Sequence, residues 1–294
     1  MKRKPGKRRR GDRFDGRWLR DEVPAMNQFM PYLMPNRTDN EAYMKVDVDT
    51  RPIDAYLAKK NEGLTEDKYT YFHVILAAMV KTVVHRPRLN RFISGNRMYL
   101  RNNISVAFVV KKQFDDKGEE ALAFKKYTKN DTIDTLHTSI MKEIHECRRA
   151  DSVDNSTDFM EKLLKLPRGV LFVLMKILFF LDRRGKVPYD LIKTDPNYAS
   201  IFLTNLGSIG MDSGYHHLNN WGTNSFFAVI GKKHMVSDWK EDGTNDVHPV
   251  ITLGLTLDER IGDGYYYSKS LKLLRKILEN PEILDKPFTE KIDY

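Results

Sequence analysis

Apolar residues along the chain recur with two different periods, which predicts a mixture of helices and strands. The segment YTYFHVILAAMVKTVV, residues 69–84, places apolar side chains three and four positions apart, as a helix requires. The same period predicts helices over residues 132–150 and 265–280. Residues 44–48 instead alternate apolar and polar side chains, which predicts a strand, and a helix is expected to open after Pro52.

The second half of the chain is rich in short β segments. Strands are predicted from SIFLTNLGSIG, SFFAVIGKK and VITLGLTLD, which begin at residues 200, 225 and 250. Short strands are also expected beside the turn at residues 94–96 and on both sides of the polar loop 111–120. Because helices and strands intermingle and no glycine-rich phosphate loop is present, the pattern predicts one α/β domain with a mixed sheet. It gives no support for ATP or NAD chemistry.

The most apolar stretch is GVLFVLMKILFFL, residues 169–181. Pro167 at its start and Gly185 after its end predict a helix with these limits. The stretch is shorter than the roughly 20 residues that a membrane span needs, and Lys176 lies in its middle. We expect a buried helix or a subunit contact rather than a helix on a membrane surface, and no association with membranes.

Positive charge is concentrated at the N-terminus. Residues 1–20 hold ten Lys and Arg against two Asp, so nearly all of the net charge of +9 lies there. Such a run is typical of a solvated tail, and no aromatic residue precedes Phe14 to stack on bases. We therefore expect residues 1–24 to form a disordered arm, followed by a folded domain over 25–294. Nucleic acid is not the expected partner, and a basic-armed module that docks on nucleic acid is kept as the weaker alternative.

The remaining composition points to an intracellular protein without metal. Cys147 is the single cysteine, so no internal disulfide is possible. No apolar segment of signal-peptide length follows the N-terminal charges, and a cytoplasmic location is expected. His137 and His145 are eight positions apart, a poor spacing for a metal pair, so no metal site is expected.

Three C-terminal segments together resemble a known family: LTNLGSIG at 203–210, FFAVIGKK at 226–233 and LDERIGDGYYYSKSLKLLRKILENPEIL at 257–284. They are similar to the catalytic domain of the dihydrolipoyl acyltransferases of 2-oxo acid dehydrogenase complexes, which is itself similar to chloramphenicol acetyltransferase. The resemblance extends forward to about residue 27 and is poor over 115–195. It implies a two-layer α/β fold with a mixed sheet, a homotrimer, and coenzyme A or an acyl-coenzyme A as substrate in a channel between subunits.

The resemblance also implies roles for particular residues. The family signature His-Arg-x-x-Asp-Gly places a histidine that takes a proton from the acceptor, and a Ser or Thr hydroxyl of the neighbouring subunit donates to the oxyanion. Thr204 occupies the hydroxyl position, and Arg260, Asp263 and Gly264 match the signature. Glu259 stands where the family has histidine.

This departure changes the expected chemistry. A carboxylate with an ordinary pKa of about 4.3 is some four units below a thiol at about 8.5, whereas an imidazole at about 6.5 is two units below it. The extra two units correspond to roughly 3 kcal/mol of lost driving force for proton transfer. Two readings therefore remain open: acyl transfer by an altered mechanism, with Glu259 as the base, and a binding or scaffold protein that keeps the fold without turnover.

Several further residues are candidates around this motif. His217 is an alternative base and His216 a weaker one, because the loop GYHHLNNWG follows the TNLGSIG segment closely. Contacts to the substrate are assigned to the turn after the candidate hydroxyl, that is, to Asn205, Gly207 and Ser208. Arg260 and Gly264 are given structural roles, and Arg51 is a candidate partner of Asp263.

The sequence also limits the assemblies that we expect. It contains no lipoyl attachment module, no subunit-binding module and no Ala-Pro-rich linker ahead of the catalytic-like region. The C-terminal PEILDKPFTEKIDY runs past the family's usual apolar finish into charged residues. We expect a free trimer that receives its acyl donor from outside rather than an integral core of a dehydrogenase complex.

Overall fold

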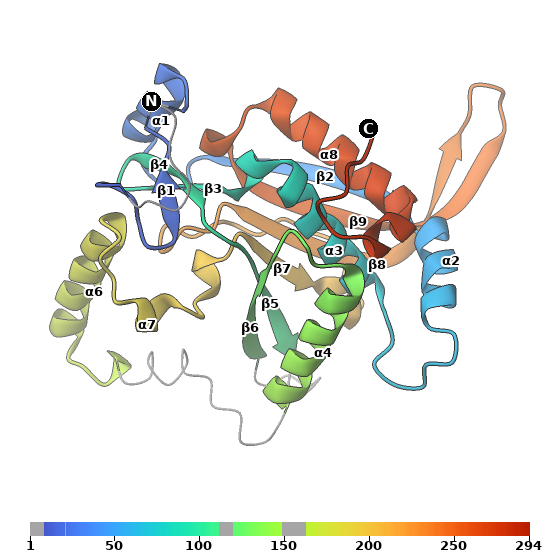
Figure 1. Cartoon of the computed structure of the whole chain (residues 1–294), viewed down its shortest axis with the longest axis horizontal. Helices are drawn as coiled ribbons and strands as arrows, with labels where there is room; N and C mark the ends of the chain where they lie inside the picture. The colour runs from blue at the N-terminus through green and yellow to red at the C-terminus, as the bar shows by residue number, and fades with distance from the viewer. Residues whose placement is uncertain (1–8, 21, 112–119, 149–162) are drawn as a thin grey trace.

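A six-stranded mixed sheet forms the centre of the computed structural model (Figure 1), which describes residues 9–20, 22–111, 120–148 and 163–294. The strand order is β2-β9-β8-β7-β5-β6. β7 runs parallel to β5 and β8, whereas the β2–β9, β9–β8 and β5–β6 pairs are antiparallel. The strands are β2 (Glu41–Asp49), β5 (Ile104–Lys111), β6 (Glu120–Tyr127), β7 (Ile201–Asn205), β8 (Phe226–Trp239) and β9 (Asn245–Asp258).

Helices cover one face of this sheet. They are α2 (Arg51–Lys60), α3 (Tyr71–His85), α4 (Ile133–Arg148) and α8 (Gly264–Glu279). The main core joins their apolar stripes to alternate residues of the strands, such as Val46 on β2 and Leu255 on β9. α3 lies at the centre and contributes buried residues from His73 to Val83. The two-layer α/β fold with a mixed sheet, predicted from the sequence, is confirmed.

The opposite face of the sheet is covered by the chain between β7 and β8. Leu218 packs on Phe227 and Val229 there. Glycines allow this close approach, because a Cβ on Gly254 would lie 2.0 Å from the carbonyl oxygen of Gly214. This face of the sheet is therefore covered by a loop rather than by helices.

A second sheet of three strands, in the order β1-β4-β3, lies beside the main one (Figure 1). Its strands are β1 (Gly16–Trp18), β3 (Arg91–Ser94) and β4 (Arg97–Arg101), and helix α1 (Ala25–Leu33) follows β1. The remaining short elements are α7 (Tyr189–Ile192), η1 (Pro87–Asn90), η2 (Pro196–Tyr198), η3 (Leu206–Ile209), η4 (Glu259–Ile261) and η5 (Pro281–Asp285).

The expectation of a disordered arm over residues 1–24 is wrong for residues 9–20 and 22–24. Residues 1–8 and 21 lie outside the described part. β1 pairs with β4, and Leu19 and Val23 are buried. Arg13 is buried too, with Asp15 at 2.8 Å and the carbonyl of Asp182 at 2.7 Å. Charge counted along the sequence could not reveal the contact with Asp182, because that residue is distant in the chain.

Helix α6 (Arg168–Arg183) forms where the apolar stretch predicted a helix, but the expectation that it is buried is wrong. Asp182 is its only buried residue. The subunit-contact reading of this helix is not tested by a single chain. Across the described ranges, no helix combines the length and the apolar character that crossing a bilayer demands.

Candidate functional site

The turn that carries Glu259 is held by hydrogen bonds on both sides. It is the 3-10 turn η4, between the end of β9 and the start of α8. The Glu259 amide donates to the Asn40 carbonyl at 2.8 Å, and Asp263 caps α8 by accepting from the Tyr266 amide at 2.8 Å. The position of Glu259 is thus set by β9, α8 and the segment before β2.

A buried ion pair fixes the interior side of this turn. Arg260 Nε and Nη2 lie 2.8 and 2.7 Å from the two carboxylate oxygens of Asp258, and Arg260 Nη1 donates to the Met34 carbonyl at 2.9 Å. Arg37 Nε lies 3.7 Å from the same carboxylate, and burial lowers the pKa of Arg37 to about 10. Because Arg260 turns inward, its charge is matched by Asp258 and does not face the Glu259 carboxylate.

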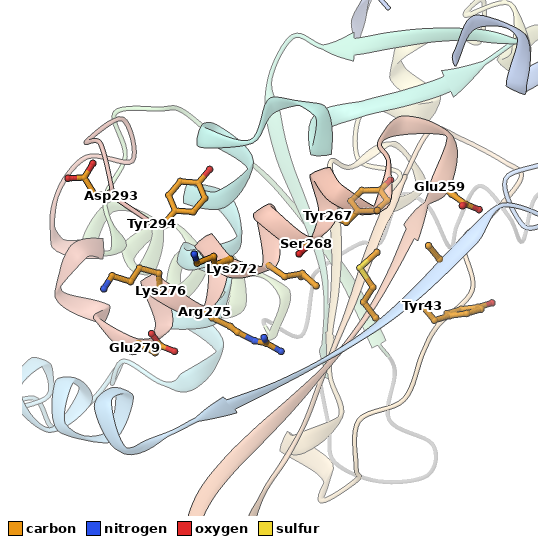
Figure 2. Close-up of a pocket in the computed structure, with 14 residues that line it drawn as sticks. Tyr43, Glu259, Tyr267, Ser268, Lys272, Arg275, Lys276, Glu279, Asp293 and Tyr294 are labelled. Carbon is orange, nitrogen blue, oxygen red and sulfur yellow. The ribbon is translucent and has the colours of Figure 1, made fainter. Parts of the chain in front are cut away.

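Glu259 itself points outward. Its side chain is exposed, and its carboxylate has no hydrogen bond or ion pair with any residue in the described ranges. It stands at one end of a surface groove of about 960 Å³ between α8, β2 and the C-terminal residues (Figure 2). A proton acceptor at this place is open to a ligand and is not consumed by a structural contact.

The wall of the groove formed by α8 is basic. Lys272, Arg275 and Lys276 line it and are exposed, and none of them has an ion pair with a described residue. Figure 2 shows the three side chains on α8, away from the end that Glu259 occupies. Glu279 and Asp293 at the same end only partly balance them. The groove therefore combines a free carboxylate at one end with unpaired cations along its length, which suits a ligand with negative groups remote from its reacting centre.

Asp263 and Gly264 lie in the adjoining helix start, but Arg51 does not. Asp263 is exposed and has Arg88 at 3.5 Å. The expected partnership of Arg51 with Asp263 is wrong: Arg51 pairs with Asp49 at 2.5 Å and with Asp246 at 3.2 Å. The register of β2 gives the reason, since Glu41 pairs with Asp258 and Asp49 with Val250, so Arg51 follows the opposite end of the strand.

Thr204 lies on β7, on the loop-covered face of the sheet. Its neighbours two positions away, Phe202 and Leu206, pack against the cluster of Leu218, Phe227 and Val229 on that face. The Thr204 side chain is half-buried, and nothing in the described residues hydrogen-bonds to its hydroxyl. A donor without a partner is consistent with a role toward a ligand.

The turn after Thr204 is shaped by a close backbone approach. A Cβ on Gly207 would lie 2.6 Å from the Gly231 carbonyl oxygen, so this position accepts only glycine without a shift of β8. Ser208 is exposed, and its hydroxyl donates to the Asn205 carbonyl at 2.7 Å. The structure brings Asn205, Gly207 and Ser208 together with Thr204 in one compact turn, while their contacts to a substrate stay a prediction.

Thr204 and Glu259 do not meet within one chain. Thr204 pairs with Val229 on β8, which pairs with Gly254 on β9, five residues before Glu259. Two strand spacings across the sheet and five residues along it amount to roughly 15–20 Å. Any site that uses both groups needs a second copy of the chain.

The histidine loop crosses the sheet toward β2 rather than toward Thr204. His216 stacks on the Phe227 ring with centroids 4.2 Å apart. His217 Nδ1 lies 2.9 Å from the Leu218 carbonyl, and the Leu218 amide donates to the Glu41 side chain. Because Glu41 is the register partner of Asp258, the loop brings His217 toward the Glu259 end of β2. The hypothesis of an imidazole placed beside Thr204 is not supported within one chain.

The other histidines have separate partners. His137 stacks on Tyr69 with centroids 3.9 Å apart, and His145 Nε2 lies 3.0 Å from Asp67. In the described ranges, no three His, Cys, Asp or Glu side chains gather as a metal site would require.

The fold is the one found in chloramphenicol acetyltransferase-like domains. The chain resembles a probable dihydrolipoamide acetyltransferase from Listeria monocytogenes 4b F2365, with a TM-score of 0.58, 15% identity, and coverage of 88% of this chain and 93% of the other. It also resembles the dihydrolipoamide acetyltransferase of Azotobacter vinelandii, with a TM-score of 0.58, 14% identity, and coverage of 90% of this chain and 93% of the other. A chloramphenicol acetyltransferase matches with a TM-score of 0.54, 15% identity, and coverage of 90% of this chain and 99% of the other. At these identities the likeness establishes the fold.

The sequence of the C-terminal third adds a more specific match. Residues 190–284 match the family model of the 2-oxoacid dehydrogenases acyltransferase (catalytic domain). No curated protein matches the chain. The resemblance drawn from the three C-terminal segments is therefore confirmed, and the matched region contains both Thr204 and Glu259.

Sequence reasoning did not single out the basic wall of the groove. Lys272, Arg275 and Lys276 are three and four positions apart on the predicted helix 265–280, so they share one face. That spacing was a usable signal. The sequence could not indicate that this face borders the groove beside Glu259, because the groove forms only when α8 packs beside β2.

Proposed function

We propose that this protein is an acyltransferase that moves an acyl group from a thioester, acyl-coenzyme A, to an acceptor, at a site shared by two protomers of a homotrimer. The observation that carries the proposal is the free, outward carboxylate of Glu259 on a turn locked by the Arg260–Asp258 pair. The resemblance sets this residue against the family's histidine. A residue held this firmly and left without a partner suits a ligand-facing role.

In this proposal each protomer supplies one half of the site. Glu259 accepts the proton of the acceptor group as that group attacks the thioester carbonyl, and Thr204 of the neighbouring protomer donates a hydrogen bond to the oxyanion that forms. The thiolate of coenzyme A then leaves and takes up the proton. This division of the site between protomers agrees with the roughly 15–20 Å between Glu259 and Thr204 in one chain. At that separation the two residues of one protomer cannot both contact the same thioester carbonyl.

The groove supplies binding energy for the donor. Lys272, Arg275 and Lys276 are unpaired among the described residues and would face the phosphates of coenzyme A, while the thioester reaches toward Glu259. In this arrangement the phosphates bind along α8, and the reacting thioester lies at the Glu259 end of the groove.

Turnover and site composition test the proposal directly. The purified chain is incubated with acyl-coenzyme A donors and thiol or amine acceptors, and free coenzyme A is measured. Glu259→Gln and Thr204→Ala should each lose at least about 100-fold in kcat/KM, as the removal of a base or an oxyanion donor does. Glu279→Gln, which changes another carboxylate of the groove, should keep activity. Glu259→His should keep or raise it, because an imidazole is the better matched base.

Subunit mixing tests whether the site is shared. Co-expression of Glu259→Gln and Thr204→Ala chains should restore part of the activity, since some interfaces in the mixed trimers combine an intact Glu259 with an intact Thr204. No turnover by the wild-type chain with any donor would contradict the acyltransferase proposal and leave a binding protein. Turnover without recovery on mixing, or a monomer in sedimentation, would contradict the shared site.

A further inference from the structure

Helix α6 presents an apolar face that the rest of the described chain leaves uncovered. Val170, Val173, Ile177 and Phe180, at positions i, i+3, i+7 and i+10, lie along one side and are 49–56% exposed. Phe172 beside them is also exposed. Figure 1 shows α6 at the edge of the molecule, clear of the six-stranded sheet.

The exposure does not result from a detached helix. Asp182 near its C-terminus is buried and accepts a hydrogen bond from the Tyr198 hydroxyl at 2.6 Å. Phe179 packs edge-on against Trp221 with centroids 5.4 Å apart, and Leu181 joins the small cluster around Tyr198. α6 is therefore anchored through one side and one end, and its apolar face is held outward.

Unpaired positive charge surrounds this face. Every basic residue from 163 to 186 is exposed and has no ion pair with a described residue: Lys165, Arg168, Lys176, Arg183, Arg184 and Lys186. Asp182, the only acidic residue in the same stretch, is buried. Arg184 lies 3.6 Å from the centre of the Phe180 ring and Lys176 lies 4.6 Å from that of Phe172, so the basic side chains extend along the apolar surface.

We infer that α6 docks in the plane of an anionic phospholipid bilayer, with Val170, Val173, Ile177 and Phe180 among the acyl chains and the basic residues at the phosphates. An apolar stripe flanked by Lys and Arg is the composition of interfacial helices. A second copy of the chain packed α6 against α6 fits this face less well, because two such helices would bring their basic residues together without a carboxylate between them. A bilayer with negative headgroups satisfies both the apolar stripe and the charges.

The experiment is vesicle flotation of the full-length protein. Wild type should float with vesicles of phosphatidylcholine and phosphatidylglycerol, and much less with phosphatidylcholine alone. The double substitution Val173→Asp/Ile177→Asp should weaken binding at least about tenfold, since it places charges in the apolar contact. Lys176→Glu/Arg184→Glu should weaken binding to the anionic vesicles roughly tenfold.

A matched control is available on the β8–β9 hairpin. Met235 and Val247 are exposed apolar residues there, and Met235→Asp/Val247→Asp should bind vesicles like the wild type. Thermal unfolding followed by circular dichroism checks that all variants are folded. Every variant retains the basic residues 1–20, so binding that is lost only in the α6 variants is attributed to α6 and not to the N-terminal charges.

Three outcomes would overturn the inference. The first is that the wild type fails to float with anionic vesicles. The second is that Val173→Asp/Ile177→Asp floats as well as the wild type, which would mean that the N-terminal charges carry the binding. The third is that this variant changes the oligomeric state in sedimentation while no form binds vesicles, which would mean that a second copy covers α6.

Discussion

Arg260 and Asp258, two residues apart in the chain, form a bidentate ion pair in the core, with 3% and 0% of their surface exposed. Glu259 lies between them and is exposed. The 3-10 turn makes this alternation possible, because it directs the two flanking side chains inward and the middle one into the groove. The charged motif thus divides into a structural pair and one free carboxylate.

Asp258→Asn should destabilise the protein strongly. The substitution leaves Arg260 and Arg37 in the core without their carboxylate, and loss of one partner of a buried pair costs about 3–5 kcal/mol in the free energy of unfolding. Denaturant titration measures this. Asp263→Asn is the matched control, since asparagine caps a helix about as well as aspartate and the residue is exposed; it should change stability by less than about 1 kcal/mol. Equal effects of the two substitutions would show that the buried pair does not hold the turn.

The basic wall of the groove should affect donor binding without affecting the chemical step. Lys272→Glu/Arg275→Glu should raise the KM for acyl-coenzyme A by roughly 10–100-fold, as expected for lost charge-assisted contacts, with little change in kcat. A short acyl thioester without phosphates should show no such increase. Lys269→Glu, on the same helix but outside the groove lining, is the control. A KM that rises equally for the short thioester would argue against phosphate contacts.

Stability should fall in mild acid because of His73. The Thr70 amide donates to His73 Nδ1 at 3.1 Å, so the ring proton is on Nε2, which is buried without a partner. Burial, helped by nearby His137, lowers the pKa of His73 to about 3. Between pH 6.5 and 3 the unfolded state binds a proton that the folded state refuses, so this contribution to stability is lost as the pH falls. At pH 4.5 the loss is roughly 2–3 kcal/mol.

His73→Gln separates this effect from helix capping. Glutamine at the third helical position can still accept the Thr70 amide, as in a capping box, but it does not titrate. Urea titrations between pH 7.5 and 4.5 should show a flatter stability profile for the variant than for the wild type. Parallel profiles would mean that other groups cause the acid sensitivity.

Gly254→Ala should loosen the loop that covers the sheet. A Cβ there would lie 2.0 Å from the Gly214 carbonyl, so the loop carrying His216 and His217 must move, and we expect a loss of about 1–3 kcal/mol as for other overpacked sites. Gly169→Ala has open space and should instead stabilise helix α6 by up to about 1 kcal/mol. Thermal melts of both variants check the signs. A neutral Gly254→Ala would show that the loop approaches β9 less closely.

The local elements could be predicted because their signals are local. The helices α3 and α8 and the strands β2 and β7 follow from residues that are neighbours in sequence, and the resemblance around TNLGSIG and DERIGDG indicated the fold that contains them. Arg51 shows the limit of this reasoning. Its pairing with Asp263 looked reasonable along the chain, but the antiparallel register of β2 and β9 places it at the other end of the sheet.

By itself, then, the sequence determined the periodic elements and the α/β class, and the resemblance singled out Glu259 as the residue to test. The tertiary structure decided that Arg13 is buried rather than part of a free arm, that α6 is anchored with its apolar face outward, and that the α8 cations border the groove beside Glu259. The physical reason is that burial and charge pairing depend on contacts between distant segments, whereas periodicity depends only on the backbone geometry of each segment.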